Sequence, residues 1–577
     1  MQLWRGGMAV LACFILVSLT GLLAQQEAAT VEPIPDNHPK TVRGPHGSLS
    51  AGETEYIQRR KEVVLESLGR LHINCTVDSV PHIALLGSGG GQRAAVALLG
   101  SLHQMGQDDL LDTLLYLGGV SGSTWAMASL YSDPQWSINM EPALSKLSGT
   151  QPRKLRSLLW LQNRAREDNF SLSEIWGLMV SILIMNHLEL RHLSVEASRK
   201  STNPYPVYTA IEKKCHTSGS IEALWFEVTP HEAGFTELGL FVPTAYLGSR
   251  FQEGELKEQK PEMDMVHLQG IMSSALAQKD SFEHLRPHWL NMTTAGDVAK
   301  DQLRVHYTLF ILVELLKSGL NISQLEELQE RIDDNLHKKV LLEAMTTEEQ
   351  ISALQQENLA LYETVHTWCQ NLPTLYQCTM MMEKLLPLAL RWEWGTTGNF
   401  LYQFKDSKVP PCLQSKQLHL IDSALSINVP YPPFLGEKRD IDLLIVPEFS
   451  AGEMFETLTL ARDYAAAVGK PFPVIDDQVL KDKDWPKDFY VFPGEHDQPT
   501  IIFMPLFNRK NCKDEAEVQA RMVQYSTFRP PFSQENMTAL QEMASANIKN
   551  NKDAIVKEIQ NAVVRRQSRR NMADPEL

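Results

Sequence analysis

Two consecutive strand–turn–helix patterns constrain what this chain of 577 residues can fold into. In the first, the apolar run 83–86 leads into the glycine-rich loop 87–91, and a helix is expected from near Arg93. In the second, the apolar run 113–120 leads into a tight turn at Ser121, which a second helix is expected to follow. Uninterrupted apolar strands are typical of a parallel sheet whose two faces are both covered by helices. The sequence therefore predicts an α/β fold.

Ser121 stands in the turn of the second pattern, between Gly119 and Gly122. Only small flanking residues permit so tight a reversal, and a helix beginning at Thr124 places the serine near the positive end of a helix dipole. These features are typical of a nucleophilic serine on a strand-to-helix elbow. The pattern G-V-S-G-S departs from the G-x-S-x-G of ordinary α/β-hydrolases, because Ser123 stands where the last glycine is expected.

The glycine loop of the first pattern leaves several bare backbone N–H groups just before a helix. Those of Gly90 and Gly91 are candidates for an oxyanion hole, in which each donor lowers the barrier to acyl transfer by roughly 3 kcal/mol. A nucleotide-binding loop is the alternative. However, a dinucleotide fingerprint requires glycine where Gln92 stands, and no G-K-[ST] sequence follows for a P-loop. The loop therefore favours an oxyanion hole.

Together, the motifs S-G-G-G-Q-R-A and G-V-S-G-S-T-W resemble the group IV cytosolic phospholipase A2 family, whose catalytic domain is related to patatin. The resemblance continues in order through W-E-W-G-T-T-G-N-F, I-D-S-A-L-S-I-N-V-P-Y-P, E-F-S-A-G and F-M-P-L-F-N, over about residues 52–508. It is nearest to the gamma type, which lacks a calcium-binding C2 module. The resemblance implies a patatin-like α/β fold with a central, mostly parallel sheet flanked by helices and with helical insertions.

The resemblance also implies that Asp422 is the partner of Ser121, without a histidine. Asp422 follows the strand-like run 417–421, and active-site groups of α/β sheets gather at strand ends. A free aspartate, with a pKa near 3.9, is a weak base at neutral pH, so the pair requires burial to raise that pKa and a hydrogen bond between the two side chains. Relatives usually have glycine shortly after this aspartate, where Ala424 stands. If that position needs a positive φ, alanine strains the turn by about 1 kcal/mol.

Arg93 and Arg439 stand where the family has arginines near its active site, so the resemblance implies that they bind the substrate. A guanidinium suits a lipid phosphate because its fork makes two charge-assisted hydrogen bonds. A structural salt bridge is the alternative for each arginine.

Taken with these residues, the resemblance implies a calcium-independent phospholipase A2 and lysophospholipase that hydrolyses the acyl ester of glycerophospholipids, or transfers the acyl group to a lysolipid. Ser121 attacks the ester carbonyl, Asp422 accepts its proton, and water hydrolyses the resulting acyl-enzyme. One rival hypothesis is a Ser-His-Asp esterase in which His419 is the base. The other is a lipid-binding relative whose catalysis is impaired by Ala424.

Composition limits the partners. The formal charge of −16, from 54 basic and 70 acidic residues, argues against nucleic acid and against general attraction to an anionic membrane. We therefore expect local contact with a phospholipid membrane or micelle interface. No H-E-x-x-H motif or paired C-x-x-C sequence indicates a metal site, and no cofactor is expected. The roughly 50 residues before the catalytic domain are too few for a C2 sandwich, which needs about 100, so calcium is not expected.

The chain is expected to contain one large catalytic domain over residues 52–540, preceded by a proline-rich linker over residues 25–51. Residues 53–71 predict an amphipathic helix that packs on this domain. Residues 321–390 predict helices inserted into the fold.

Two further helical segments have a second interpretation as membrane contacts. The apolar run 176–185 is typical of a core helix, because exposed apolar patches of that size are rare, and its alternative is a membrane-contacting face. Residues 541–577 predict a basic helical tail that is either solvated or in contact with anionic headgroups.

Residues 1–24 predict a signal peptide or an uncleaved signal anchor, since an uncharged apolar run follows Arg5. Five N-x-[ST] sequons add modest support for the secretory pathway: Asn74, Asn169, Asn291, Asn321 and Asn536. Cys369 and Cys378 are a candidate pair in an oxidising compartment, but the sequence does not determine the connectivity, and six separate buried thiols are the alternative. We expect the endoplasmic reticulum lumen or membrane, or secretion. The family resemblance implies the alternative, a cytosolic and membrane-associated protein.

Overall fold

A computed structural model describes residues 40–44, 48–147, 154–278, 391–527 and 531–573, and a few positions between 349 and 389. The expected signal peptide, most of the linker and nearly all of the 321–390 insertion lie outside the described residues, as do Asn291, Asn321, Cys369 and Cys378. The chain divides into two units, Met1–Lys40 and Thr41–Leu577, and the fold and the candidate site belong to the second.

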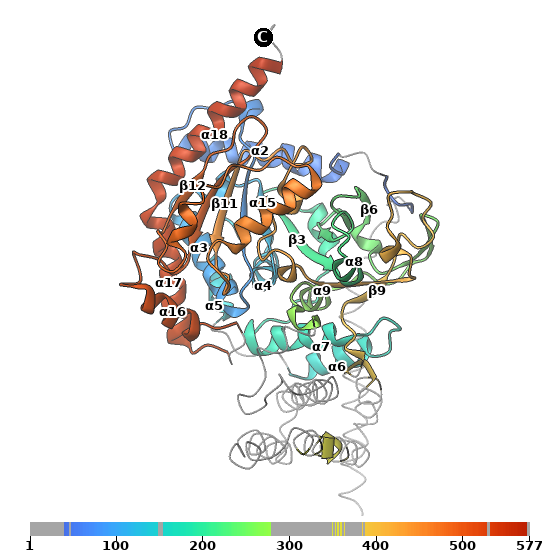
Figure 1. The fold of residues 1–577 in the computed structure, drawn as a ribbon. Helices are drawn as coiled ribbons and strands as arrows, with labels where there is room; N and C mark the ends of the chain where they lie inside the picture. The colour runs from blue at the N-terminus through green and yellow to red at the C-terminus, as the bar shows by residue number, and fades with distance from the viewer. Residues whose placement is uncertain are drawn as a thin grey trace, which may run out of the picture. The chain divides into compact units, whose positions relative to one another are not determined.

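A mixed sheet, of eleven strands within the described residues, forms the centre of this unit (Figure 1). Five strands are parallel, in the spatial order β13, β11, β1, β2 and β3. Their bounds are Ile83–Gly87 for β1, Tyr116–Gly119 for β2, Tyr205–Glu212 for β3, Leu443–Glu448 for β11 and Thr500–Pro505 for β13. Every residue of these strands is buried, which explains why their sequences are continuous apolar runs without alternation.

Antiparallel strands extend the sheet at both edges. On one side β12 (Tyr490–Phe492) pairs with β13, and on the other β4 (Trp225–Val228), β5 (Glu232–Phe235) and β6 (Leu240–Pro243) follow β3. Off this order, β10 (Gln417–Asp422) pairs with β3 and with the short β9 (Thr396–Gly398). The strands β7 (Arg250–Gln252) and β8 (Glu255–Glu258) form a separate hairpin. The observed architecture confirms the expected α/β class with its largely parallel centre.

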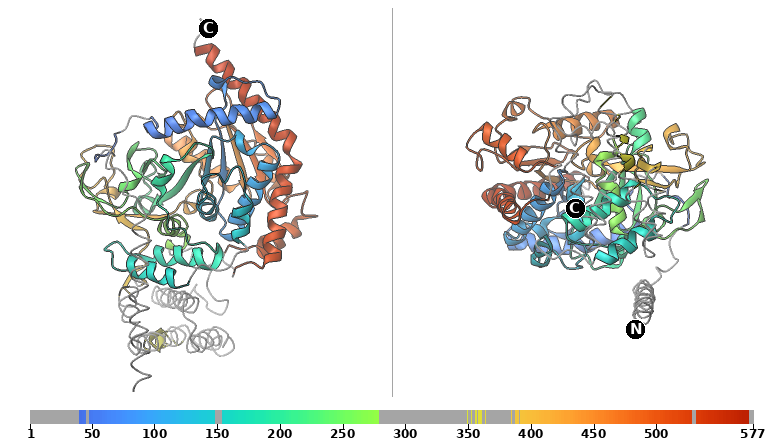
Figure 2. Two further views of the ribbon diagram at one scale, coloured as in Figure 1. Left: turned by 180° about the vertical axis from the view of Figure 1, so that it is seen from behind. Right: turned by 90° about the horizontal axis from the view of Figure 1, so that it is seen from below.

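Helices cover both faces of the sheet (Figures 1 and 2). α3 (Gln92–Gln107) connects β1 to β2, and α15 (Glu456–Val468), which lies between β11 and β12 in the chain, is on the opposite face of the sheet. The other helices with assigned bounds are α2 Ala51–Arg70, α4 Gly122–Leu130, α5 Glu141–Leu147, α6 Lys154–Arg164, α7 Leu172–Met179, α8 Lys213–Ser218, α9 Met265–Met272, α16 Glu515–Gln524, α17 Gln534–Asn550 and α18 Lys552–Ala573.

Both strand–turn–helix patterns are present, with small shifts in their boundaries. The second strand begins only at Tyr116, because a 3-10 turn occupies Leu111–Thr113, and its helix begins at Gly122 instead of Thr124. The expected helix over residues 53–71 is α2, which begins two residues earlier because the Ser50 side chain caps it.

The apolar run 176–185 is a core element. It contains the end of α7 and a π-helical turn over Val180–Ile184, whose side chains Val180 and Ile182 are buried. α7 packs closely on α9, which favours the core interpretation over a membrane-contacting face. Within the described part of the chain, no helix has both the length and the apolar character needed to cross a bilayer.

The expected tail is an integral part of the domain. α17 runs straight through the expected boundary at residue 540 and packs along α3. The next helix, α18, buries Ile555, Ile559 and Val563. Its basic residues Arg566 and Arg569 form ion pairs with the buried Asp442, which precedes β11. These arginines neutralise a protein carboxylate and are therefore engaged within the fold instead of being free for lipid headgroups.

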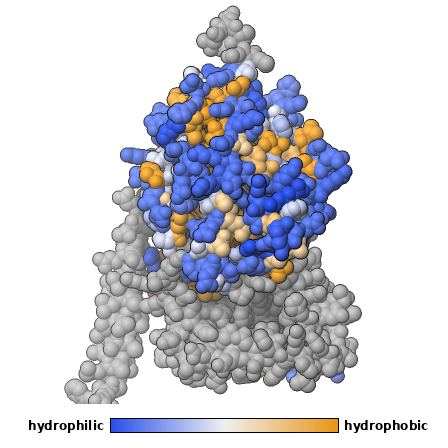
Figure 3. Space-filling model, turned by 90° about the vertical axis from the view of Figure 1, so that its left-hand side faces the viewer, coloured by the Kyte–Doolittle hydropathy of each residue, from blue (hydrophilic) through white to orange (hydrophobic). Residues whose placement is uncertain are grey.

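The surface is mainly hydrophilic on the face shown in Figure 3, where apolar side chains form separate groups. Large apolar side chains that are exposed come from different elements of the chain, among them Ile138, Leu460 and Val474. Scattered exposed apolar residues are ordinary in globular proteins, so they do not by themselves define a membrane-docking surface.

The packing of α18 predicts a stability effect. Ile559→Ala should lower the free energy of unfolding by about 2–5 kcal/mol, because it leaves a cavity beneath a fully buried side chain. Val564→Ala on the same helix should change it by less than about 0.5 kcal/mol, because Val564 is 59% exposed. Urea denaturation of both variants measures the difference. Equal stability of the two would contradict the packed position of this helix.

Candidate active site

Ser121 lies in the turn between β2 and α4, as the sequence predicted. Its backbone has φ 51° and ψ −119°, a conformation that costs a residue with a side chain about 1–3 kcal/mol. The turn is tight because a Cβ on Gly122 would lie 2.0 Å from the carbonyl oxygen of Gly91. Glycine is therefore required after the serine, and the strained serine has the geometry of a nucleophile elbow.

The glycine loop lies directly against this turn. A Cβ on Gly89 would lie 2.9 Å from the Cβ of Ser121. Gly90 and Gly91 have φ values of 151° and 59°, which glycine adopts readily and other residues do not. Neither of their N–H groups donates a hydrogen bond to another group of the described chain. Two unused donors therefore lie in the loop beside the serine, where an oxyanion hole was expected.

Ser123 and Asn428 anchor this loop, and neither role was predicted from the sequence. The buried Ser123 hydroxyl donates to the Ser88 carbonyl oxygen at 2.6 Å, which explains why serine replaces the expected glycine. On the other side, the Gly89 N–H donates to the Asn428 carbonyl oxygen at 3.0 Å, and the Asn428 amide donates back to Gly89 at 3.3 Å. The available signal for Asn428 was its place in the motif that begins I-D-S-A-L.

Ser121 and Asp422 are brought together because β2 and β10 meet end to end along one edge of β3. Gly119, at the end of β2, is paired with Tyr208, whereas Asp422, at the end of the antiparallel β10, is paired with Ala210. The opposite edge of β3 is occupied by β4. The carboxyl ends of the two strands therefore point at each other.

Thr209, between these two positions on β3, links the two strand ends. Its hydroxyl donates to the Gly119 carbonyl oxygen at 3.1 Å and also contacts the Ser423 hydroxyl at 2.9 Å. All three groups are buried. This bridge fixes the turn that carries Ser121 to the turn that follows Asp422.

Asp422 is completely buried, and its carboxylate is incompletely hydrogen-bonded. Oδ1 accepts a hydrogen bond from the Ala424 N–H at 2.9 Å, whereas buried Oδ2 has no hydrogen-bond partner among the described residues. Burial raises the pKa of Asp422 to about 7, although the nearby Ser121 hydroxyl and the Ala424 N–H partly oppose this rise. The carboxylate is thus a stronger base than a free aspartate and lies near the serine hydroxyl.

Ala424 does not strain the turn, contrary to the concern raised by the sequence. It lies in a 3-10 turn, Ser423–Leu425, and is not among the residues with a positive φ. Alanine fits this position because the turn is right-handed. Ala424 therefore gives no reason to expect that Asp422 is displaced.

His419 is not placed to serve as the base of a triad. It lies three residues before Asp422 on the same strand, so the two side chains point to opposite faces, and the strand separates them by about 10 Å. Burial lowers the pKa of His419 to about 4. The geometry favours the pair of Ser121 and Asp422 over the Ser-His-Asp alternative.

Arg93 is fully buried beneath the glycine loop. Its guanidinium donates to the carbonyl oxygens of Phe449 at 2.7 Å and of Tyr525 at 2.5 Å, and one nitrogen would lie 2.9 Å from a Cβ on Gly90. Burial lowers the pKa of Arg93 to about 10, which leaves it charged at neutral pH. It therefore supports the loop and places a positive charge behind it, instead of presenting its fork to a lipid phosphate.

Arg439 lies away from the candidate site, in a buried ion-pair cluster. It makes two hydrogen bonds to Glu53, at 2.9 and 3.2 Å, and two to Glu227, at 3.0 and 3.1 Å. It also lies over the rings of Phe434 and Tyr116, the latter at the far end of β2 from Ser121. Arg439 therefore forms a structural salt bridge, which was the alternative to substrate binding.

The chain is similar to known proteins in both sequence and fold. The family model of the lysophospholipase catalytic domain matches residues 159–305. Cytosolic phospholipase A2 gamma of Homo sapiens is 32% identical over 529 residues, which cover 89% of this chain and 95% of that protein. This chain belongs to the group IV cytosolic phospholipase A2 family. Family membership makes it a hydrolase of the phospholipase A2 and lysophospholipase type and implies phospholipid substrates.

Other family members extend the comparison. Cytosolic phospholipase A2 gamma of Mus musculus is 28% identical over 557 residues, covering 89% of this chain and 92% of that protein. The solved structure of human GIVD cytosolic phospholipase A2 matches with a TM-score of 0.63 at 22% identity, over 92% of this chain and 67% of its own. The same protein in complex with methyl gamma-linolenyl fluorophosphonate matches with a TM-score of 0.60 at 22% identity, over 93% and 67%. These structures show that the fold is shared.

The buried Asp422 predicts a pH-dependent stability difference. Its folded-state pKa of about 7 lies above the unfolded value near 3.9, so ionisation destabilises the folded chain increasingly as the pH rises between these two values. Asp422→Asn remains neutral. Its stability relative to the wild type should therefore rise by about 3 kcal/mol between pH 5 and pH 8.

Denaturant unfolding at the two pH values measures this change. Asp477→Asn, at an exposed carboxyl, is the matched control and should show no comparable rise. If the difference in unfolding free energy between Asp422→Asn and the wild type did not change with pH, the pKa of Asp422 would not be raised in the folded chain.

Proposed function

We propose that this chain is a phospholipase A2 with lysophospholipase activity, in which Ser121 is the nucleophile and Asp422 is the general base. The observation that carries the proposal is the meeting of β2 and β10, which places a buried carboxylate with a pKa near 7 beside a strained elbow serine. A base whose pKa lies near the working pH is effective in proton transfer. We also propose that the reaction requires no calcium, because the proposed chemistry uses only protein groups.

The proposed reaction begins when ionised Asp422 accepts the proton of Ser121 as its Oγ attacks the ester carbonyl carbon. The N–H groups of Gly90 and Gly91 donate to the oxyanion that forms, and the charge of Arg93 behind the loop favours it further. The intermediate collapses, the bond between the carbonyl carbon and the glycerol oxygen breaks, and Asp422 returns the proton to that oxygen of the departing lysophospholipid, or of the departing glycerophosphodiester when the substrate is a lysophospholipid. The acyl group remains on Ser121.

Hydrolysis of the acyl-enzyme repeats these steps with water. Asp422 takes a proton from the attacking water, a second oxyanion forms in the same loop, and its collapse releases the fatty acid and regenerates Ser121. A lysolipid hydroxyl in place of water gives transacylation. The substrates enter from a phospholipid membrane or micelle interface.

The dyad predicts a specific pattern of variants. Ser121→Ala and Asp422→Asn should each lower kcat at least about 100-fold, because they remove the nucleophile and the base. His419→Gln should retain activity, since His419 faces away from the pair. Release of labelled fatty acid from mixed micelles measures turnover, and labelling by a fluorophosphonate reports the serine directly. Loss of turnover in the His419 variant with normal folding would instead support the triad.

The pH dependence follows from the sign of the Asp422 shift. The base must be ionised, so kcat/KM should rise as the pH increases and should level off above about 7. A wild-type profile that is flat between pH 5 and pH 8 would contradict the assigned base.

We further propose that the chain enters the secretory pathway. The described structure contains a disulfide, Cys215–Cys412, and such bonds persist mainly in oxidising compartments. The sequon residue Asn74 is exposed between α2 and a short 3-10 turn, where a glycan is compatible with the fold. By contrast, the half-buried Asn169 and Asn536 accept hydrogen bonds from neighbouring side chains. A cytosolic and membrane-associated location remains the alternative.

Glycosylation tests this location. When the chain is expressed in cultured eukaryotic cells, its electrophoretic mobility should increase after endoglycosidase treatment. In Asn74→Gln this increase should be smaller by the contribution of one glycan. In Asn536→Gln it should equal that of the wild type. A wild-type chain unaffected by the glycosidase would support the cytosolic alternative.

A further inference from the structure

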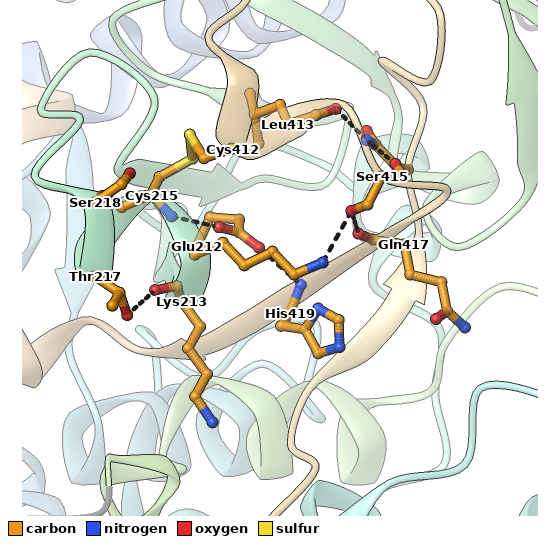
Figure 4. Close-up of a disulfide and its surroundings, with 12 residues drawn as sticks. Glu212, Lys213, Cys215, Thr217, Ser218, Cys412, Leu413, Ser415, Gln417 and His419 are labelled. Carbon is orange, nitrogen blue, oxygen red and sulfur yellow. Dashed lines mark hydrogen bonds between the residues drawn. A yellow bond between two sulfur atoms is a disulfide. The ribbon is translucent and has the colours of Figure 1, made fainter.

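The Cys215–Cys412 disulfide joins two segments that are 197 residues apart in sequence (Figure 4). Cys215 lies in α8, immediately after β3, and is fully buried. Cys412 lies in a 3-10 turn, Pro411–Leu413, shortly before β10, and is partly exposed. The bond therefore connects the end of β3 with the approach to the strand that carries Asp422.

A buried carboxylate supports the same connection. Glu212, the last residue of β3, accepts hydrogen bonds from the Cys215 N–H at 2.7 Å and from the His419 N–H at 3.1 Å. Figure 4 shows this side chain between the disulfide and the strand. The Glu212 carboxylate is thus hydrogen-bonded to both α8 and β10. The disulfide adds a covalent link between α8 and the segment before β10.

Additional contacts at the approach to β10 are polar and partly exposed. The Asn399 amide donates to the carbonyl oxygens of Leu413 and Ser415, each at 2.7 Å, and the Lys214 ammonium donates to the Ser415 hydroxyl at 3.1 Å. β10 lies off the main strand order, and each of its pairings is short: it pairs with β3 over residues 420–422 and with β9 over residues 417–419. Its position therefore depends on the contacts at its start more than that of a central strand does.

We propose that the Cys215–Cys412 disulfide is a positioning element for Asp422, and that its reduction lowers the rate of acyl transfer. The inference rests on the proposed role of Asp422 as the base. The bond holds the start of β10 against the end of β3, and the rigid strand carries that constraint to the carboxylate three residues beyond His419. A displacement of about 1 Å in a catalytic group can cost about 100-fold in rate.

A dithiol such as dithiothreitol reduces the Cys215–Cys412 disulfide in two thiol–disulfide exchange steps. A thiolate of dithiothreitol attacks the partly exposed Cys412 sulfur and displaces Cys215 as a thiolate, which is then protonated. The second thiol of the reagent attacks the mixed disulfide, releasing Cys412 as a thiol and oxidised cyclic dithiothreitol. Two protein thiols and one reagent disulfide result.

The test compares the double variant Cys215→Ser/Cys412→Ser with Cys75→Ser, which replaces a partly exposed free cysteine between α2 and the 3-10 turn Val77–Ser79. We expect kcat of the double variant to fall about 10- to 100-fold, while KM changes by less than about threefold. The midpoint of its kcat/KM profile should fall below 7, because a less constrained carboxyl is better solvated. Cys75→Ser should match the wild type in all three quantities.

Reduction of the wild type under native conditions provides a second measurement if the double variant does not fold. Dithiothreitol should lower kcat of the wild type reversibly while circular dichroism reports a folded chain, and it should not affect the double variant. An active double variant with an unchanged pH profile would overturn the positioning role. If Asp422→Asn were itself fully active, the proposed catalytic role would fail instead, and the two failures are therefore distinguishable.

Discussion

The candidate site depends on one shared edge of a single strand, β3. β2 and β10 approach this edge from opposite directions, and their carboxyl ends stop on either side of Thr209. No local sequence pattern brings Ser121 and Asp422 together; their proximity follows from strand register. Because a shift of one residue turns every side chain to the other face of a sheet, the register is a requirement for the chemistry as well as for packing.

This arrangement is maintained against local strain and desolvation. Ser121 has a backbone conformation that most residues avoid, and Asp422 is a buried carboxylate with one oxygen that has no hydrogen-bond partner in the described part of the chain. Both features destabilise the folded chain, as is common where a protein holds reactive groups in place. The surrounding buried strands and the ties from Ser123 and Asn428 to the glycine loop hold these groups in position.

The sequence predicted local features better than distant contacts. The apolar runs and glycines of β1 and β2 located the loop and Ser121 because strand burial and tight turns leave signals within a few residues. Asp422 was identified through resemblance to a family, since nothing near it indicates its partner. The environment of Arg439 was not predictable, because Glu53 and Glu227 lie 386 and 212 residues away in sequence. The Cys215–Cys412 pairing was missed for the same reason, as spacing alone does not determine which cysteines meet.

The order of the strands has a consequence during protein synthesis. Ser121 is made early, whereas Asp422 follows 301 residues later, and β11, the neighbour of β1 at the middle of the sheet, is made after both. A nascent chain on the ribosome therefore contains the serine for a long period without its carboxylate partner or a completed sheet. Under the proposed mechanism, which needs both groups, lipolytic activity is acquired only after Asp422 and β11 have been synthesised, so a shorter nascent chain close to a bilayer leaves the surrounding lipids intact.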